Sequence, residues 1–232
     1  MSENYTAHPN WVRRSEMEVS DRTHHYIVLS YLNAWMVEHA LPQATGNLLD
    51  YGSGGQPYRK LFETNVDRYV TADVAVYGEL VPDILLRPNE AIDCKDGHFD
   101  TILSTQTLEH VEDPDFYLNE CARVIKQGGT LILTAPMQWR HHEIPYDYFR
   151  YTRFGLETLL SRNGFSVQSI KSTGGAFALI GQILLNFLNE RGVYRPLLYK
   201  IINRSALWLD RRFPDGEDVI NWMVIAKKTN SA

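Results

Sequence analysis

A carboxylate followed directly by a glycine cluster is the stretch of this sequence best suited to hold a small-molecule ligand. The apolar run over residues 47–51 contains Asp50, and Gly52, Gly54 and Gly55 follow at once. Such a pattern indicates a buried parallel strand that leads through a tight turn into a helix, whose first N–H groups are free. Asp50 would repel a phosphate group, so the turn favours a ligand with hydroxyl groups and a positive charge.

Two other glycine motifs fit this spacing less well. The dinucleotide fingerprint has glycines at its first, third and sixth places. Counted from Gly52, the third place is Gly54 but the sixth is Pro57. The phosphate-binding P-loop ends in Gly-Lys-Ser or Gly-Lys-Thr, which this stretch lacks. An NAD(P)-dependent Rossmann oxidoreductase therefore stays an alternative with weaker support.

A second stretch, residues 136–152, is dense in side chains that can transfer protons or bind polar ligands. Loops of this kind commonly carry function, because a rigid scaffold presents their side chains. Two other interpretations stay open. Asp147 and Arg150 could simply pair with each other, or the loop could bind a metal through imidazole and carboxylate ligands. Adjacent histidines in one loop rarely face the same ion, so no metal is expected. The side chains concerned are His141, His142, Glu143, Tyr146, Asp147, Arg150 and Tyr151.

Apolar runs and helix signals alternate along the chain at βαβ spacing, which predicts an α/β fold with a mainly parallel sheet. Apolar residues at helical spacing after Asp21 indicate a helix that packs on the sheet or caps the ligand cleft. Asp113-Pro114 and Thr152 are typical helix starts, and Gly128-Gly129 and Asn163-Gly164 are expected to end those two helices. The strands are expected at about 47–51, 68–73, 82–86, 99–104, 130–135, 165–170 and 218–226.

Polar residues follow three of these strands. Tyr51 to Gly54 follow the first, Asp73 ends the second, and Thr105 to Leu108 follow the fourth. Open α/β sheets bind ligands beyond the carboxyl ends of their strands. One ligand could therefore contact all three groups, and Asp73 lies where doubly wound folds place the acid that binds a ribose diol.

In this order and spacing, the motifs resemble those of class I S-adenosylmethionine-dependent methyltransferases of type 11. The resemblance covers roughly residues 47–170 and the final strand. The sequence departs from the family pattern at Gln56, where the family usually has a third spaced glycine, and Arg87 lies where an acid often contacts adenine. The motifs that carry the resemblance are Asp50-x-Gly52-x-Gly54-Gly55, Asp73, Phe99-Asp100, Leu108-Glu109-His110-Val111 and Arg123 to Leu131.

The resemblance implies a doubly wound, mostly parallel, seven-stranded Rossmann-like sheet with an antiparallel last strand. It also implies S-adenosyl-L-methionine as cofactor and S-adenosyl-L-homocysteine as product. Asp50 would order the glycine turn and the methionine amine, and Asp73 would take the ribose hydroxyls. Glu109-His110 would anchor a helix start. The implied cofactor-binding residues are Asp50, Tyr51, Gly52, Ser53, Gly54, Asp73, Val74, Thr105, Gln106 and Leu108.

The implied reaction is in-line methyl transfer to a hydroxyl or amine of a small molecule or sugar, with a surface-glycan precursor as one candidate. The segment from His142 to Thr152 resembles a loop of bacterial members of the family. A hydroxyl acceptor must lose its proton, and an imidazole is suited to accept it. We expect His142 to act as general base, with Asp147 orienting it or the acceptor. Arg150 would hold an anionic or polyhydroxyl substrate, and Tyr146 would line the site.

Composition and charge limit the possible partners and location of the protein. The 232 residues carry a net charge of −5, which argues against nucleic acid as a partner. Two cysteines suit a reducing, cytoplasmic location. No segment has the length and apolarity of a membrane span. Four parts are expected: an N-terminal arm and helix (1–46), the cofactor-binding core (47–172), a helical insertion (173–217), and the final strand with its tail (218–232).

The helical insertion bears on possible partners. Its apolar and amphipathic segments predict a lid or a homodimer surface, and a peripheral membrane contact is the alternative. A non-catalytic S-adenosylmethionine-binding subunit that serves a partner through this insertion is a further alternative to the enzyme.

Overall fold

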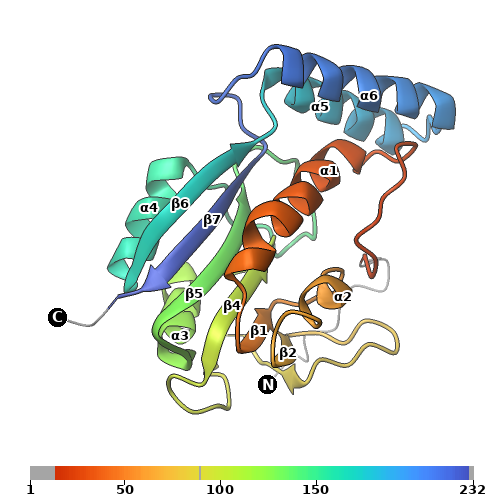
Figure 1. The fold of residues 1–232 in the computed structure, drawn as a ribbon. Coiled ribbons are helices and arrows are strands. Elements are labelled where there is room, and N and C mark those ends of the chain that lie inside the picture. Colours follow the sequence, from red (N-terminus) through yellow and green to blue (C-terminus); the bar gives the residue numbers. More distant parts are fainter. Residues whose placement is uncertain (1–13, 89, 230–232) are drawn as a thin grey trace.

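A seven-stranded sheet organises the molecule in the computed structural model, which describes residues 14–88 and 90–229 (Figure 1). The strand order is β3-β2-β1-β4-β5-β7-β6. This confirms the expected doubly wound α/β fold. The strands are β1 (Asn47–Tyr51), β2 (Arg68–Asp73), β3 (Ile84–Leu85), β4 (Phe99–Thr105), β5 (Ile125–Pro136), β6 (Phe165–Thr173) and β7 (Asn221–Lys228).

The first five strands are parallel, and β7 lies antiparallel between β5 and β6. The chain moves outward from β1 to β2 and β3, then returns to β4 on the other side of β1. This reversal between β1 and β4 is a topological switch point, where the connections leave the sheet in opposite directions and open a crevice. The glycine turn follows β1 directly, so the fold places it at the crevice.

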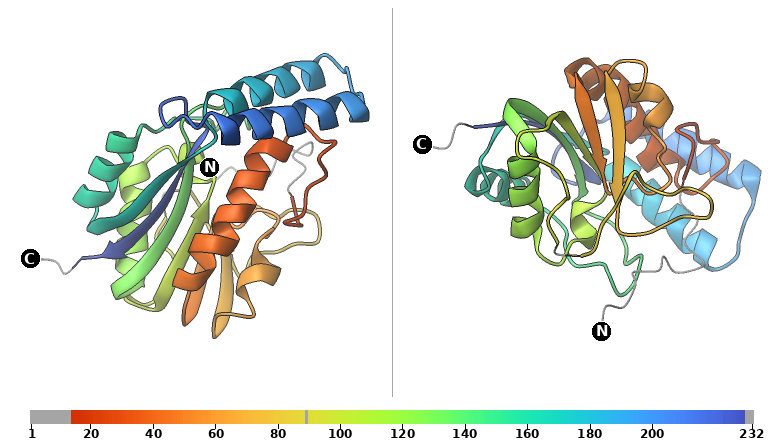
Figure 2. Two further views of the ribbon diagram at one scale, coloured as in Figure 1. Left: turned by 45° about the horizontal axis from the view of Figure 1, so that its top comes forward. Right: turned by 90° about the horizontal axis from the view of Figure 1, so that it is seen from below.

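Helices cover both faces of the sheet (Figure 1). Helix α1 lies on one face, and α3 and α4 lie on the other. The short α2 follows the glycine turn, and α5 and α6 form an antiparallel pair beyond the end of the sheet (Figure 2). The helices are α1 (Tyr26–Trp35), α2 (Arg59–Phe62), α3 (Pro114–Val124), α4 (Arg153–Arg162), α5 (Ala176–Glu190) and α6 (Pro196–Arg212).

Alternation along the strands builds two cores, one on each face. Leu131 and Leu133 of β5 point to the core that holds Leu118, whereas Ile132 between them belongs to the core that holds Leu32. Side chains of a strand point alternately to the two faces of the sheet. When the residues on both faces are apolar, both faces must be covered. Cys121 is fully buried on the α3 side.

Capping explains where two helices begin. The Asp113 carboxylate accepts a hydrogen bond from the Phe116 N–H at 3.0 Å, and Pro114 is the first residue of α3. The Thr152 hydroxyl accepts one from the Gly155 N–H at 3.1 Å at the start of α4. Both starts confirm the prediction, because each cap satisfies an N–H group that lacks a helical partner.

The expected end of α3 at Gly128-Gly129 is wrong. The helix ends at Val124, and β5 begins at Ile125. Ile125 pairs with Phe99 and Thr130 pairs with Thr101, so residues 126–129 form an irregularity between two paired parts of one strand. Gly128 has a φ of +71° and serves this bulge. The helix after the glycine turn, α2, has a single turn.

The segment between β6 and β7 consists of α5 and α6, which pack against each other and against α1. Tyr199 and Leu207 of α6 are buried in the same core as Trp35. Within residues 14–88 and 90–229, no helix has the length and apolarity needed to cross a membrane. The part of the N-terminal arm over residues 1–13 lies outside the described residues, and so do residues 230–232 at the end of the tail.

Candidate active site

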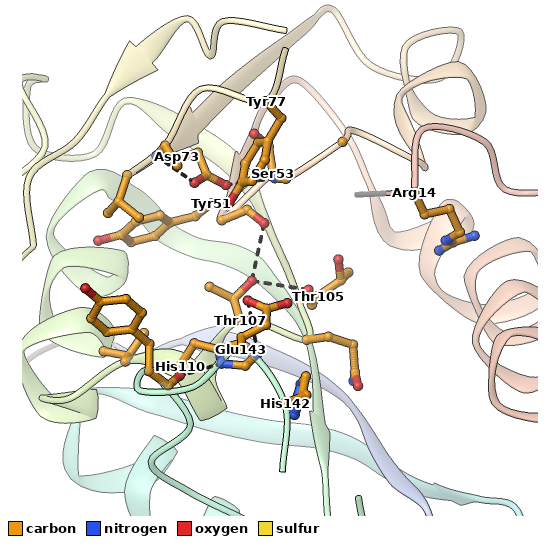
Figure 3. Close-up of a pocket in the computed structure, with 18 of the residues that line it drawn as sticks. Arg14, Tyr51, Ser53, Asp73, Tyr77, Thr105, Thr107, His110, His142 and Glu143 are labelled. Atoms are coloured by element: carbon orange, nitrogen blue, oxygen red, sulfur yellow. Dashed lines mark hydrogen bonds and ion pairs between the residues drawn. The ribbon is translucent and has the colours of Figure 1, made fainter. Parts of the chain in front are cut away.

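A cavity of about 490 Å³ opens at the carboxyl ends of β1, β2 and β4. Its wall includes the glycine turn, the end of β2, the end of β4 and the loop after β5, and α1 contributes Val28 and Leu32. Figure 3 shows Ser53, Asp73 and Tyr77 toward one end and His110, His142 and Glu143 toward the other. The fold therefore brings the glycine turn and the loop after β5, the two stretches singled out in the sequence, to opposite ends of one cavity.

The glycine turn requires glycine for two physical reasons. Gly52 has a φ of +80°, and a Cβ on it would lie only 2.3 Å from Cγ2 of Thr107. Gly54 has a φ of +50°, and its N–H donates to Oδ2 of Asp73 at 2.7 Å. The Ala75 N–H donates to Oδ1 of Asp73 at 3.0 Å. Asp73 thus ties the turn after β1 to the end of β2 while it lines the cavity.

Asp50 lies behind the turn rather than in the cavity wall. Its side chain is buried, and Oδ2 accepts a hydrogen bond from the Tyr69 hydroxyl at 2.6 Å. Burial raises the pKa of Asp50 to about 7, although the Tyr69 hydrogen bond opposes this shift. Among the residues that the structure describes, Oδ1 of Asp50 and Oγ of the neighbouring Ser53 have no hydrogen-bond partner. A ligand with a cationic or N–H-bearing group at this turn would supply the hydrogen bonds that these two oxygen atoms lack.

The end of β4 supplies the next part of the wall. Gln106 adopts a φ of +51°, where its N–H donates to the Thr134 carbonyl oxygen at 3.1 Å and its side chain donates to the Thr134 hydroxyl at 3.1 Å. Thr105, Gln106 and Thr107 line the cavity. Leu108 does not, because its side chain is fully buried in the core beneath.

Eight of the ten expected cofactor-binding residues therefore line the cavity, and two lie next to it. Asp50 and Leu108 are the two outside the wall. The residues in the wall are Tyr51, Gly52, Ser53, Gly54, Asp73, Val74, Thr105 and Gln106.

The loop after β5 folds back over the end of β4. The N–H groups of Tyr148 and Phe149 donate to the Glu109 carbonyl oxygen at 2.9 and 3.2 Å. The Tyr151 hydroxyl donates to the Leu108 carbonyl oxygen at 3.0 Å. These bonds place His142, Glu143 and Tyr146 in the cavity wall.

Asp147 and Arg150 do not line the cavity. Arg150 donates to both carboxylate oxygens of Asp147 at 2.6 and 2.9 Å, and to the carbonyl oxygens of Trp139 and Arg140 at 3.0 and 2.9 Å. The Asp147 side chain is only 3% exposed. Burial raises the pKa of Asp147. Hydrogen bonds from the Arg150 side chain and the His142 backbone N–H outweigh this effect and hold the pKa of Asp147 well below its ordinary value. In place of the expected substrate contact, Arg150 pairs with Asp147 and holds the loop.

His142 is half-buried in the wall, whereas the adjacent His141 is 85% exposed. Burial and the neighbouring His110 lower the pKa of His142 to about 4, so its imidazole is neutral at pH 7. The centroids of the His110 and His142 rings lie 4.6 Å apart. Burial also raises the pKa of Glu109 to about 8.

Several wall residues were not expected from the sequence. His25 and Leu29 come from α1 and the residue before it, and Arg14 lies across the cavity from Tyr51 (Figure 3). His110 belongs to a motif that was assigned an anchoring role, and Glu143 adjoins the expected base. The helical spacing after Asp21 left two interpretations, packing on the sheet or capping the ligand cleft, and α1 does both.

Comparisons with known proteins agree with this architecture. A family model described as "Methyltransferase domain" matches residues 49–133, from β1 to β5. No curated protein matches the sequence. The [4+2]-cyclase SpnF has a similar structure, with a TM-score of 0.59 and 17% identity over 96% of this chain and 89% of that chain.

Two methyltransferase structures are also similar. One is a putative methyltransferase of Bacillus halodurans, with a TM-score of 0.55 and 15% identity over 87% of this chain and all of the other. The other comes from a complex between the Haloferax volcanii Trm112 methyltransferase activator and a putative methyltransferase, with a TM-score of 0.55 and 16% identity over 92% of this chain and all of that chain. At these identities the likeness concerns the fold.

Fold and cavity together define a doubly wound α/β protein with a ligand site at its switch point. The family model over residues 49–133 agrees with the type 11 class I resemblance that the motifs indicated. The family match confirms the cofactor prediction at the level of the domain, whose methyl donor is S-adenosylmethionine. The site fits this group: unpartnered Asp50 Oδ1 and Ser53 Oγ lie at the turn, and Asp73 lies in the wall.

Proposed function

We propose that this protein transfers a methyl group from S-adenosylmethionine to a hydroxyl or amine of a small molecule or sugar. The observation that carries the proposal is the single cavity that joins the glycine turn and Asp73 to His142, Glu143 and Tyr146. A cofactor held at one end and an acceptor at the other would share this space. Holding the two reactants together can supply ~7–11 kcal/mol of the barrier reduction.

The residues at the first end would hold the cofactor. Asp73 would bind the ribose hydroxyls, and Asp50 would act from behind the turn on the cationic amine of the methionyl part. Thr105 and Gln106 would line the path between the two ends. When bound, S-adenosylmethionine supplies a sulfonium-linked methyl group for in-line displacement.

The residues at the second end would act on the acceptor. His142 is neutral at pH 7 and lies in the wall, so its imidazole can accept the proton that a hydroxyl or ammonium acceptor must lose. Asp147 accepts a hydrogen bond from the His142 N–H at 3.1 Å and positions the residue without entering the cavity. Arg150 holds Asp147 in turn, and Tyr146 supplies part of the wall.

A second candidate function is a reaction other than methyl transfer at the same site. The similar SpnF structure is a cyclase, so this fold also occurs in a protein named for a different reaction. A non-catalytic S-adenosylmethionine-binding subunit stays the alternative, and the Haloferax protein gives an example of the fold in complex with an activator. The nicotinamide alternative is disfavoured by Pro57 at the sixth place of the turn.

Partners and location complete the proposal. The α5–α6 pair would serve as a lid or as a surface for a second copy or a membrane, and a cytoplasmic location agrees with two free cysteines. Nucleic acid is not proposed as a partner, given the net charge of −5.

The test combines calorimetry with a transfer assay. We expect S-adenosylmethionine and S-adenosylhomocysteine to bind the purified chain one to one, with no heat from NADH. Candidate sugars, phenols and amines are then incubated with a methyl-labelled donor. His142→Ala should lower turnover at least about tenfold with nearly unchanged cofactor affinity, since a proton acceptor typically contributes a hundredfold or more.

His98→Ala is the control, because it removes an exposed imidazole just before β4, at the opposite end of that strand from the site, and should leave turnover unchanged. Absence of heat with both cofactor forms would refute the proposal. Cofactor binding without transfer to any acceptor would favour the non-catalytic subunit, and full activity of His142→Ala would remove His142 from the reaction.

A further inference from the structure

Three side chains from two segments meet at the acceptor end of the cavity. Glu109 and His110 lie in the short 3₁₀ turn Leu108–His110 after β4, and His142 lies in the loop after β5. One ligand atom from each lies within 4.8 Å of the other two. Oε2 of Glu143 lies 3.8 Å from Nε2 of His110 on the same side of the cavity (Figure 3).

Backbone carbonyl groups fix which nitrogen of each imidazole is available. Nδ1 of His110 lies 2.6 Å from the Tyr146 carbonyl oxygen, and Nδ1 of His142 lies 3.2 Å from the Arg140 carbonyl oxygen. A carbonyl oxygen only accepts, so each Nδ1 must carry the proton. Nε2 of each neutral ring then presents a lone pair. This arrangement orients metal-binding histidines in proteins generally.

The buried carboxylate of Glu109 is a second observation that points to a cation site. Its side chain is fully buried, and neither carboxylate oxygen has a hydrogen-bond partner among the residues that the structure describes. The guanidinium group nearest in the loop, that of Arg150, is bound to Asp147 instead. An uncompensated buried carboxylate is costly, so this one needs either a proton or a cation beside it.

We propose that Glu109, His110 and His142 bind one divalent transition-metal ion, with Glu143 as an additional ligand. Two imidazoles with carboxylates suit Zn²⁺, Mn²⁺ or Co²⁺ better than Mg²⁺, which prefers oxygen ligands. Bond lengths of about 2.0–2.2 Å place the ligand atoms of a tetrahedral ion roughly 3.5 Å apart. Ligand atoms within 4.8 Å of one another need only a small inward movement to reach this spacing.

The position of the ion has a consequence for the acceptor, which rests on the proposed function. His110, His142 and Glu143 line the cavity, so open coordination positions would face the acceptor. A divalent ion there would bind an acceptor with oxygen atoms on adjacent carbons and lower the pKa of the bound hydroxyl. The hydroxyl proton would pass to water, the oxygen would form the new bond to the methyl carbon, and the sulfur–methyl bond would break. His142 would then act as a ligand.

The first experiment measures metal binding without any methyl transfer. The full chain is stripped with a chelator and titrated with Zn²⁺ and Mn²⁺ by calorimetry, and with Co²⁺ by visible absorption. We expect one ion per chain and a tetrahedral or five-coordinate Co²⁺ spectrum. Glu109→Gln and His110→Gln should each weaken binding about tenfold or more. His141→Gln removes an exposed imidazole on the same loop and should bind as the wild type does.

The outcomes separate this inference from the proposed function. Failure of the wild type to bind Zn²⁺, Mn²⁺ and Co²⁺ would overturn the metal site, and so would binding that survives both Glu109→Gln and His110→Gln. Circular dichroism checks that each variant folds, and His110→Gln decides if Glu109→Gln does not. Calorimetry with S-adenosylhomocysteine on the metal-free chain tests the cofactor site separately, since that site lies at the other end of the cavity.

Discussion

Asp50 and Asp73 carry the same carboxyl group in different surroundings. Asp73 lies in the cavity wall and accepts N–H groups from Gly54 and Ala75, whereas Asp50 is buried behind the turn with one oxygen unpartnered. Burial raises the pKa of Asp50 to about 7. A residue of this kind makes the cofactor-free protein sensitive to pH, because its charged form lacks a counterion.

The sign of that sensitivity follows from the raised pKa. The folded state holds a proton on Asp50 that the unfolded state releases near pH ~3.9. The stabilisation from this group is therefore complete below about pH 4 and is lost as the pH rises through about 7. We predict that Asp50→Asn removes this loss, so the variant gains in melting temperature relative to the wild type between about pH 5 and pH 8.

Thermal unfolding of the cofactor-free proteins at both pH values measures the effect. The exposed Asp93→Asn is the control and should show the same difference from wild type at both. If the gap between Asp50→Asn and wild type did not change with pH, the buried carboxyl would not be the cause. Asp50→Asn should also weaken S-adenosylhomocysteine binding, since it removes the negative charge behind the turn.

At the scale of elements, a buried ion pair helps to hold the loop after β5 in place. Arg150 binds Asp147 through two hydrogen bonds and also binds the carbonyl groups of Trp139 and Arg140. Because Asp147 is 3% exposed, removal of its charge leaves the guanidinium group partly buried without its partner. The loop carries His142, so its order and the acceptor end of the cavity depend on this pair.

We predict that Asp147→Asn lowers the free energy of unfolding by about 1–3 kcal/mol and reduces turnover. Cofactor affinity should remain nearly unchanged, because the glycine turn and Asp73 line the end of the cavity away from this loop. Urea denaturation and calorimetry measure the two quantities. Glu157→Gln breaks the exposed pair with Arg153 on α4 and should change stability by no more than about 0.5 kcal/mol. Equal effects of the two variants would contradict the role given to Asp147.

The same loop shows where sequence-based prediction reached its limit. Apolar runs located the strands, and Asp113 and Thr152 marked two helix starts, because these signals are local. The pairing of Arg150 with Asp147 was one of two interpretations left open, since residue types in a loop do not tell which side chains face the cavity. Glu109 and His110 were assigned an anchoring role, because only the pairing of β4 with β5 brings the later loop onto them. These roles depend on contacts between residues that are distant in the sequence, which local patterns do not predict.

At the scale of the whole molecule, α5 and α6 form a layer beyond the sheet with an exposed apolar surface. On α6, Leu197, Ile201 and Trp208 lie on one stripe at helical spacing, opposite the buried Tyr199 and Ala206. On α5, Ile180, Ile183, Leu184 and Phe187 are likewise exposed. Contiguous exposed apolar side chains on this scale usually mark an interaction surface.

Charge helps to decide what this surface contacts. Arg211 and Arg212 are exposed on the same stripe of α6, and Arg204 on this stripe is paired with Asp21 at 2.7 Å. Two copies that met symmetrically through it would bring these cations together, which is unfavourable. An amphipathic helix with basic residues beside its apolar face binds the surface of an anionic membrane. Of the contacts expected for this segment, the charge pattern therefore favours the membrane over a dimer.

We predict that the full chain floats with vesicles that contain anionic phospholipid and not with vesicles of phosphatidylcholine alone. The binding should weaken as salt is raised, because the arginines contribute through screened charge. Ile201→Ser combined with Trp208→Ser should abolish it, whereas Phe154→Ser removes an exposed aromatic ring from α4 and should not. Equal flotation with both lipids would contradict the electrostatic part. A wild-type dimer in light scattering that the double variant dissolves would instead assign the stripe to a second copy of the chain.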